Sequence, residues 1–276
     1  MSLTQINSNI QALNSLNALK NINGRMSMHQ TRLSTGKKIN STEEDPAGFA
    51  LATGLERRRR GLDVALQNVN NAKNILNVAE GGYQNQLDIL QTVKEKATQA
   101  ADYSLSTAQR TAINDQVTAL LDEIDSIQDE TTFNGANLID GNYDGHFQTG
   151  EGADDNLHVS LNQSDSSSVG GTDVSVIDLT TANGASTAIS TVSSAIDNLA
   201  ESLQDIGEFK ARLSSKEKTL SVASTNTEAV RSSVEDADFA KEQMEVMKLQ
   251  IMQQTAVSSF AQANASGQVV LSIVGR

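Results

Sequence analysis

The chain has 276 residues, a formal net charge of −13, one proline and no cysteine. The negative charge argues against general binding to nucleic acid or to anionic membranes, which need a positive field, and the lack of cysteine excludes disulfide and thiolate–zinc frameworks. Aromatic residues make up only 3 % of the chain, so a thick globular core is not expected, and a single proline leaves long helices unobstructed.

The first expected helix lies near the N-terminus, where apolar residues recur at three- and four-residue steps. They are Leu3, Ile6, Ile10, Leu13, Leu16, Leu19 and Ile22. The same stretch has no basic start followed by an apolar run, so we expect no Sec-type signal peptide, and no segment is apolar for long enough to cross a membrane. Residues 32–45 are rich in turn formers and predict a break.

A long second helix is expected to begin at Pro46, with Asp45 as its cap. Its apolar residues at seven-residue steps are Leu55, Leu62, Val69, Leu76, Tyr83, Leu90 and Ala97. Three residues further along, from Leu62 on, come Ala65, Ala72, Ala79, Gln86, Val93 and Ala100. Such a repeat predicts a coiled-coil rod of roughly 80 Å, and the alanines indicate close helix approach.

A third helix and an irregular segment follow. The helix is indicated by Ile113, Val117, Leu120, Ile124 and Ile127. Residues 131–184 are rich in Gly, Asn, Asp and Ser, and within them "LHVSL" and "DVSVIDL" predict the short strands of a β hairpin.

The heptad pattern then returns in a second long helix. Its members are Ile189, Val192, Ile196, Leu199, Leu203, Ile206, Leu213, Leu220, Thr227 and Val234. The two rod helices can pair within the chain only by folding back, which brings the terminal helices side by side. We therefore expect a mainly α fold: a long antiparallel coiled-coil rod with a small β hairpin and paired terminal helices.

The C-terminal helix carries two apolar rows. One row is Val246, Leu249, Met252, Ala256, Phe260 and Ala263, and the other is Met244, Met247 and Ile251. Because a helix on a globular surface needs a single apolar stripe, the second row predicts a partner beyond the N-terminal helix.

Several candidate sites have plainer interpretations. Asp140, Asn142, Asp144 and Glu151 match a calcium-loop pattern with Gly145 at its turn, but an EF-hand needs helices on both sides, so we expect no calcium binding. Residues 57–60 are four arginines without interleaved aromatics, which favours a solvated or intersubunit face over a nucleic-acid site.

No enzyme is expected. The histidines His29, His146 and His158 show no metal-ligand spacing, and no nucleophile or phosphate-loop motif is present, so we predict neither a metal, nor a cofactor, nor catalytic residues.

Three stretches resemble the bacterial flagellins. They are residues 6–55, which include "INSNIQAL" and "RLSTGKKINSTEEDPAG"; residues 131–141, "TTFNGANLIDG"; and residues 230–276, which include "VEDADFA" and "QTAVSSFAQAN". The resemblance implies a structural subunit that polymerises into the extracellular flagellar filament for motility, in a minimal form without large outer domains. A hook–filament junction protein and a stand-alone coiled-coil adhesin or binding module are the alternatives.

The resemblance also implies a division of the chain. Residues 1–42 and 235–276 would be the terminal helices of the inner filament core, 43–132 and 186–234 the rod helices, and 133–185 the hairpin and irregular segment. The self-assembly interface would comprise Ile6, Ile10, Leu13, Met244, Met247, Leu249, Ile251, Met252 and Phe260. Partners implied are further copies of the chain, an export chaperone on the C-terminal helix, and the filament cap and hook-junction proteins, with export through the flagellar type III apparatus.

Two further implications concern the surface. The hydroxyl-rich residues 164–172 are either a flexible exposed loop or a candidate for O-linked glycans, at Ser164, Ser166, Ser167, Ser168 or Thr172. The resemblance places the surface that Toll-like receptor five recognises in the family at Leu90, Thr92 and Gln116. The recognised pattern has Arg and Glu at the latter two positions, so this sequence argues against recognition.

Overall fold

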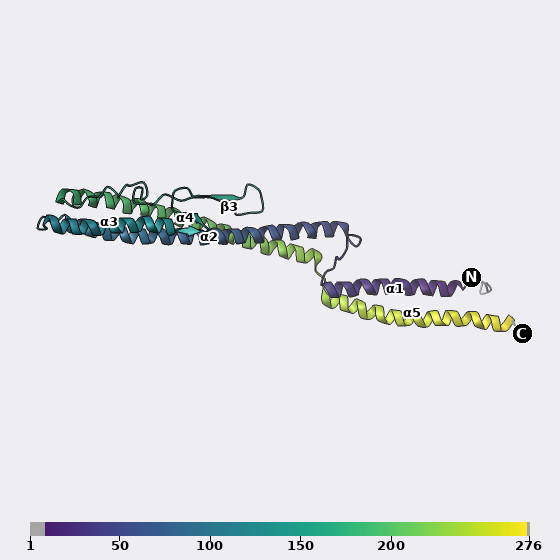
Figure 1. Ribbon diagram of the computed structural model, residues 1–276. Helices are drawn as coiled ribbons and strands as arrows, with labels where there is room; N and C mark the ends of the chain where they lie inside the picture. The colour runs from purple at the N-terminus through teal and green to yellow at the C-terminus, as the bar shows by residue number, and fades with distance from the viewer. Residues whose placement is uncertain (1–8, 275–276) are drawn as a thin grey trace. The chain divides into compact units, whose positions relative to one another are not determined.

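The computed structural model describes residues 9–274, and the side chains of residues 9–265. Over that range the helices are α1 (Ile10–Thr35), α2 (Pro46–Ala100), α3 (Thr107–Glu130), α4 (Ala182–Glu235) and α5 (Phe239–Val274), as Figure 1 shows. The strands are β1 (Thr132–Phe133), β2 (Ala136–Asn137), β3 (Asp144–Gln148) and β4 (Asn156–Ser160). The mainly α prediction is confirmed. Among the described helices, none combines the length and apolar character needed to cross a membrane.

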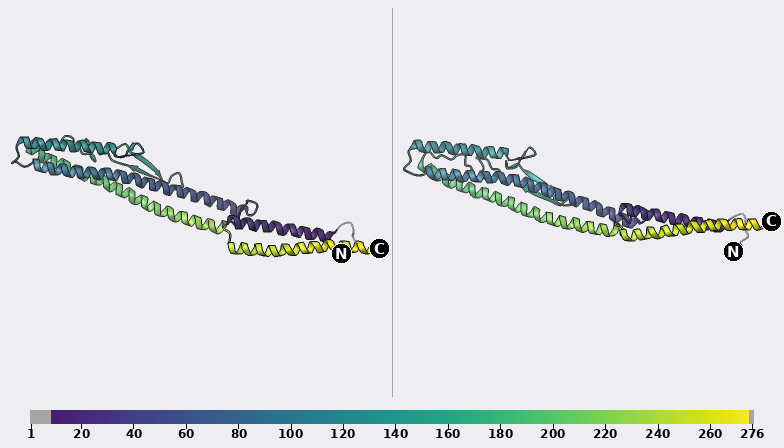
Figure 2. Two further views of the ribbon diagram at one scale, coloured as in Figure 1. Left: turned by 60° about the horizontal axis from the view of Figure 1, so that its bottom comes forward. Right: turned by 90° about the horizontal axis from the view of Figure 1, so that it is seen from below.

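The chain divides into two compact units. One unit combines the described parts of residues 1–57 and 226–276, and the other comprises residues 58–225. In the second unit α2 and α4 run side by side (Figure 2). Lys73 pairs with Glu217 at 2.8 Å, and Lys210 pairs with Glu80 at 2.6 Å. Because the partner numbers fall on α4 as they rise on α2, the two helices are antiparallel, as predicted.

The apolar heptad of α2 forms the core of this unit. Its buried members include Leu62, Val69, Leu76, Tyr83, Leu90 and Ala97, together with Ala65, Ala72, Ala79, Gln86, Val93 and Ala100. Leu55, at the start of the repeat, is only half-buried. Small side chains in the second position let the neighbouring helices approach closely, so this part of the sequence pattern is confirmed.

On α4 the predicted heptad is partly wrong. Residues at seven-residue steps are buried as expected, among them Val192, Leu199, Ile206, Leu213 and Leu220. The second buried position, however, holds Ala188, Ala195 and Ser202, whereas the larger Ile189, Ile196 and Leu203 lie half-buried at the flanks. The close approach favours small side chains at this position, as on α2.

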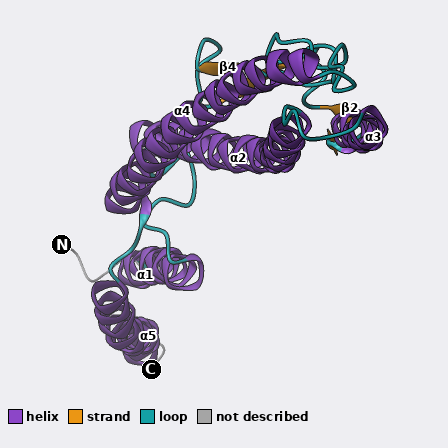
Figure 3. Cartoon of the chain, turned by 90° about the vertical axis from the view of Figure 1, so that its left-hand side faces the viewer, coloured by secondary structure: helices purple, strands orange, loops and turns teal. Residues whose placement is uncertain are grey.

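Helix α3 folds back along α2 (Figure 3) and buries Ile113, Val117, Leu121 and Ile124. Leu121 replaces the expected Leu120, which is half-buried. A capping box of Ser106 and Gln109 begins the helix. The guanidinium of Arg110 donates to three carbonyl oxygens of the preceding turn, at 2.6–2.9 Å, and so fixes the connection from α2.

The β hairpin has a different partner strand from the one predicted. The "LHVSL" stretch forms β4, but "DVSVIDL" forms no strand; its Val174 and Leu179 are buried without pairing. β4 pairs instead with β3, antiparallel, with His146 opposite His158. The sequence did not indicate β3 because its first two residues, Asp144 and Gly145, are of types that are depleted in strands. A second, two-residue hairpin joins β1 to β2 through Asn134 and Gly135, both at positive φ, as a tight Asn–Gly turn requires.

Candidate assembly surface

Helices α1 and α5 pack against each other as an antiparallel pair within the first unit (Figure 1). The side-chain amide of Asn9, which also caps α1, donates to the carbonyl of Ala263 at 2.8 Å, and Gln253 donates to Asn23 at 2.7 Å. Gly36 caps the C-terminal end of α1, and its left-handed φ of 70° suits glycine. The prediction that the terminal helices lie side by side is confirmed.

The pair covers the first apolar row of α5. Val246 and Ala263 are buried, Leu249 is 0 % exposed, and Phe260 is half-buried, whereas Met252 remains exposed. Leu249, which we expected at an intersubunit interface, therefore stabilises the pair within one chain.

The second apolar row of α5 is exposed among the residues that the structure describes. The exposed fractions are 59 % for Met244, 49 % for Met247 and 66 % for Ile251. Phe239 and Val257 add to the exposed apolar surface of α5, and the two-row analysis of the sequence missed both because they lie outside either row.

On α1, Ile10 and Leu13 are one turn apart and both are exposed. Ile6 lies outside the described residues. Six of the residues predicted for the self-assembly interface are exposed and are called the assembly row below: Ile10, Leu13, Met244, Met247, Ile251 and Met252.

A network of charged residues holds the start of α5 against the end of α1. Nδ1 of His29 contacts the carboxylate of Glu242, both residues being buried, and Arg32 reaches Glu242 at 3.7 Å and Glu44 at 3.5 Å. Lys37 pairs with Glu235, and backbone bonds from Lys38 to Glu235 and from Ala237 to Gly36 join the same segments. Sequence reasoning missed this network because its members lie about two hundred residues apart.

Arg231, in the part of α4 that belongs to the first unit, extends the network. Arg231 contacts Glu228 and Glu235 at 2.7 and 2.6 Å, and Glu56 of α2 lies 3.7 Å away. Its hydrogen bonds to Glu228, followed by those to Glu235, raise the pKa of the Arg231 guanidinium. The side chain therefore stays charged at any pH at which the protein is folded.

The calcium-like residues of the irregular segment are engaged elsewhere. Asp144 lies on β3 and contacts His158, whereas Glu151 pairs with Arg58 at 2.9 Å. Asn142 donates both its backbone and side-chain N–H groups to Asp140. Asp140 and Asn142 thus form a local turn, and the absence of calcium binding remains a prediction.

Residues 6–144 match the family model described as the bacterial flagellin N-terminal helical region, and residues 189–274 match the one described as the C-terminal helical region. The chain is a bacterial flagellin. Curated flagellins match over almost their full length. Flagellin FlaB1 of Treponema pallidum is 30 % identical over 283 residues, and a flagellin of Halalkalibacterium halodurans is 32 % identical over 272 residues; each match covers 98 % of this chain and 99 % of the relative.

A solved structure shares the fold. It is a putative flagellar hook-associated protein from Vibrio parahaemolyticus, with a TM-score of 0.59 and 14 % identity, covering 70 % of this chain and 100 % of that one. At this identity the likeness concerns the fold alone, whereas the sequence matches are to flagellins. This flagellin is therefore a structural subunit of the flagellar filament, outside the cell, and the junction-protein and adhesin alternatives are not favoured.

The hydroxyl-rich segment of this flagellin is packed against the rod. Ser164 is completely buried and donates its hydroxyl to Gln86, Ser166 donates its own to Asp125, and Thr172 accepts from Asn198. Ser168 is half-buried, so Ser167 is the exposed candidate for a glycan among the four serines and one threonine. The interpretation as a flexible exposed loop does not account for the burial of Ser164.

The receptor-reading surface inferred from the resemblance is also partly buried. Leu90 is 0 % exposed in the rod core, whereas Thr92 is half-buried and Gln116 exposed. Leu90 is therefore unavailable to a receptor in the folded flagellin. Of the four consecutive arginines, Arg58 pairs with Glu151 and Arg59 with Asp63 at 2.8 Å, in keeping with a solvated face.

Proposed function

We propose that the assembly row is the surface through which neighbouring subunits hold each other in the filament. The observation that carries this proposal is the exposure of Met244, Met247 and Ile251 on a helix whose other face is already covered by α1. Contiguous exposed apolar side chains on a soluble protein mark a site of association. In a chain of net charge −13, an apolar row also gives subunits a place to meet without like charges.

The energy of burial supports such a role. Fully burying one large aliphatic side chain stabilises by about 1.5–3 kcal/mol relative to leaving it exposed. The three residues of the second row are already partly covered, so each contributes about half of that value. In a helical polymer every subunit buries its assembly row against its neighbours. The small free-energy gain at one interface is therefore repeated at every interface along the filament.

We further propose that residues 1–42 and 235–276 form the inner core of the filament. The rod helices, 43–132 and 186–234, would form the layer outside it, with residues 133–185 on the outer surface. The exposed apolar residues of α1 and α5 support an interior position for these helices, because an interior position would cover them on every side.

Before assembly the same row needs protection from water. We propose that an export chaperone binds α5 through Met244, Met247 and Ile251, that the chain leaves the cell through the flagellar type III apparatus, and that cap and hook-junction proteins meet it at the filament ends. No step in this account requires a cofactor, nucleic acid, a membrane or catalysis.

A charge placed in the assembly row tests the proposal. Ile251→Glu should abolish salt-induced filaments seen by electron microscopy, while the monomer keeps its melting temperature because the side chain is exposed. Val176→Glu is the matched control, since Val176 is an exposed apolar residue, 72 %, of the irregular segment. Normal filaments from Ile251→Glu, or their loss from Val176→Glu alone, would refute the assignment.

A further inference from the structure

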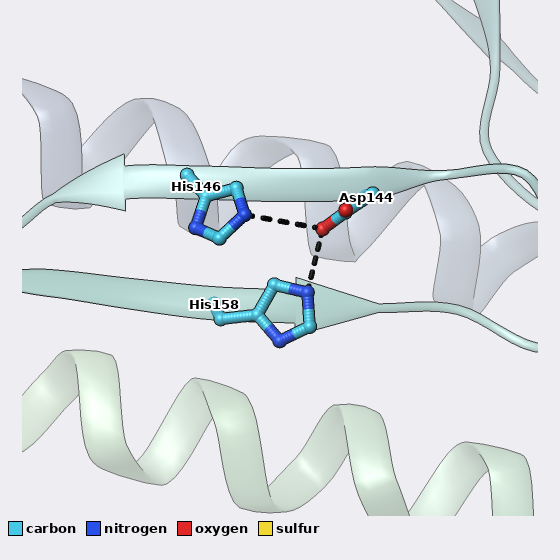
Figure 4. A group of neighbouring side chains, drawn as sticks. All are labelled: Asp144, His146 and His158. Atoms are coloured by element: carbon cyan, nitrogen blue, oxygen red, sulfur yellow. Dashed lines mark hydrogen bonds and ion pairs between the residues drawn. The ribbon is translucent and has the colours of Figure 1, made fainter.

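The outer face of the β3–β4 hairpin gathers two imidazoles and a carboxylate. His146 and His158 are directly opposed across the two strands, with ring centroids 4.7 Å apart. Asp144 lies two residues before His146 and so shares its face of the strand. Figure 4 shows the three side chains together in front of the hairpin. Both histidines are exposed, so burial in a core does not explain the cluster.

The packing of the hairpin against the rod core leaves the face that carries Asp144, His146 and His158 exposed to solvent. Leu157 and Val159 of β4 are buried in the rod core, and Phe147 of β3 packs partly against it. Side chains alternate across a strand. His158, between Leu157 and Val159, and His146, next to Phe147, therefore point to solvent. The apolar side of the hairpin thus holds the three polar side chains at fixed register on the opposite side.

The distances suit one small ion. Oδ1 of Asp144 lies 3.4 Å from Nε2 of His146 and 2.5 Å from Nε2 of His158, and the three ligand atoms all lie within 4.8 Å of one another. Ligands of a tetrahedral zinc ion, at about 2.0–2.2 Å from the metal, are roughly 3.4 Å apart. All three side chains are exposed, so rotations of the Asp144 carboxylate and of the two imidazoles can bring the ligand atoms to such a spacing.

We propose that Asp144, His146 and His158 bind one divalent transition-metal ion of the zinc class. Imidazole nitrogen favours zinc and its neighbours in the transition series, whereas calcium and magnesium prefer oxygen, of which this site offers a single carboxylate. Three protein ligands leave a fourth position open to water.

Binding would join β3 to β4 at the end of the hairpin away from its turn. The site lies within one chain, so it would be repeated once in every subunit of a polymer. The inference does not depend on the assembly row, since none of the three ligands belongs to α1 or α5.

Binding of the ion is tested most directly by nuclear magnetic resonance of the full-length protein with labelled histidines. The chain has three histidines, and buried His29 serves as an internal control. Addition of Zn²⁺ should shift the imidazole signals of His146 and His158 to saturation at one equivalent and leave His29 unchanged. Ca²⁺ at the same concentration should shift none of them. Unchanged signals of His146 and His158, or equal shifts with Ca²⁺, would overturn the proposal.

Variants then identify the ligands. In calorimetric titration with Zn²⁺, His146→Gln, His158→Gln and Asp144→Asn should each weaken binding at least about tenfold, the usual scale for loss of a metal-site contact. Asp154→Asn removes the same charge from an exposed position of the hairpin turn and should leave the affinity unchanged. Equal affinity of the double variant His146→Gln/His158→Gln would show that the zinc binds elsewhere.

Discussion

Gln86 and Ser164 exchange hydrogen bonds in the middle of the rod core. The side-chain amide of Gln86 donates to the carbonyl oxygen of Ser164 at 2.7 Å, and the hydroxyl of Ser164 donates to the carbonyl oxygen of Gln86's side chain. The same amide also reaches the carbonyl of Ile124 on α3 at 3.1 Å. One polar residue in an otherwise apolar position of the α2 repeat thus anchors both α3 and the irregular segment.

Gln86→Leu should therefore lower the free energy of unfolding by about 2–4 kcal/mol, because it leaves the buried carbonyl oxygen and hydroxyl of Ser164 without their partner and removes the additional hydrogen bond to Ile124. Urea denaturation measures the change. Gln91→Leu is the control, since Gln91 is exposed on the same helix. Adding Ser164→Ala to Gln86→Leu should cost less than it does alone, because the two residues share one interaction. Strictly additive losses would contradict this coupling.

Leu76→Ala should destabilise the rod by about 2–5 kcal/mol, since Leu76 is completely buried in the α2 repeat and truncation leaves a cavity. Val78→Ala, at an exposed position of the same helix, should have little effect. Leu203→Ala should fall between the two, because Leu203 is half-buried. An unchanged melting temperature for Leu76→Ala would show that the heptad register is wrong.

Tyr83 should make the free energy of unfolding of the rod fall as the pH becomes alkaline. Burial raises the pKa of its phenol, whose hydroxyl lies 2.5 Å from the carbonyl oxygen of Asn162. The folded pKa lies above the unfolded value of about 10, so this contribution is complete below pH 10 and decreases as the pH rises further.

Tyr83→Phe should consequently cost about 1 kcal/mol near neutral pH, where the hydrogen bond to Asn162 is lost. The difference between wild type and variant should narrow above about pH 10, because the phenol of Tyr83 then ionises in the unfolded wild type while burial keeps it protonated in the folded state. Denaturation at a series of pH values up to 11 measures it. A difference that stays constant, or widens, with rising pH would contradict the assignment.

Removal of residues 236–276 should leave residues 58–225 folded, because these residues form a compact unit with its own buried core. The truncated chain should keep amide protection in α3 and in the 58–225 portions of α2 and α4 but fail to polymerise. Filaments from the truncated chain would exclude α5 as an assembly element.

The sequence predicted those elements whose residues repeat locally. The seven-residue spacing from Leu62 to Ala97 located the core of α2, and Asp45, whose side chain accepts from the backbone of Gly48 at 3.0 Å, marked its start. The two rows of α5 likewise separated the buried Val246, Leu249 and Ala263 from the exposed Met244, Met247 and Ile251, because a helix of known period fixes which residues share a face; Met252 of the first row is nevertheless exposed.

The features that sequence analysis missed depend on contacts between distant residues. Ser164 looked like a surface serine because nothing near it in sequence reveals Gln86, its hydrogen-bond partner. His146 and His158 meet only through the pairing of β3 with β4, and β3 has a composition unlike a strand. On α4 either Leu203, which is apolar, or Ser202, which is small, could occupy the second buried position of the heptad. Only the close approach of α2 selects the smaller Ser202.

The central claim is that neighbouring subunits cover the assembly row. Hydroxyl-radical footprinting with mass spectrometry compares the reactivity of Met244, Met247 and Ile251 in monomer and filament, with Tyr103, 83 % exposed at the turn between α2 and α3, as the internal reference. The account predicts that all three react readily in the monomer and become strongly protected in the filament, while Tyr103 reacts equally in both. Undiminished reactivity of Met244, Met247 and Ile251 in filaments would contradict it.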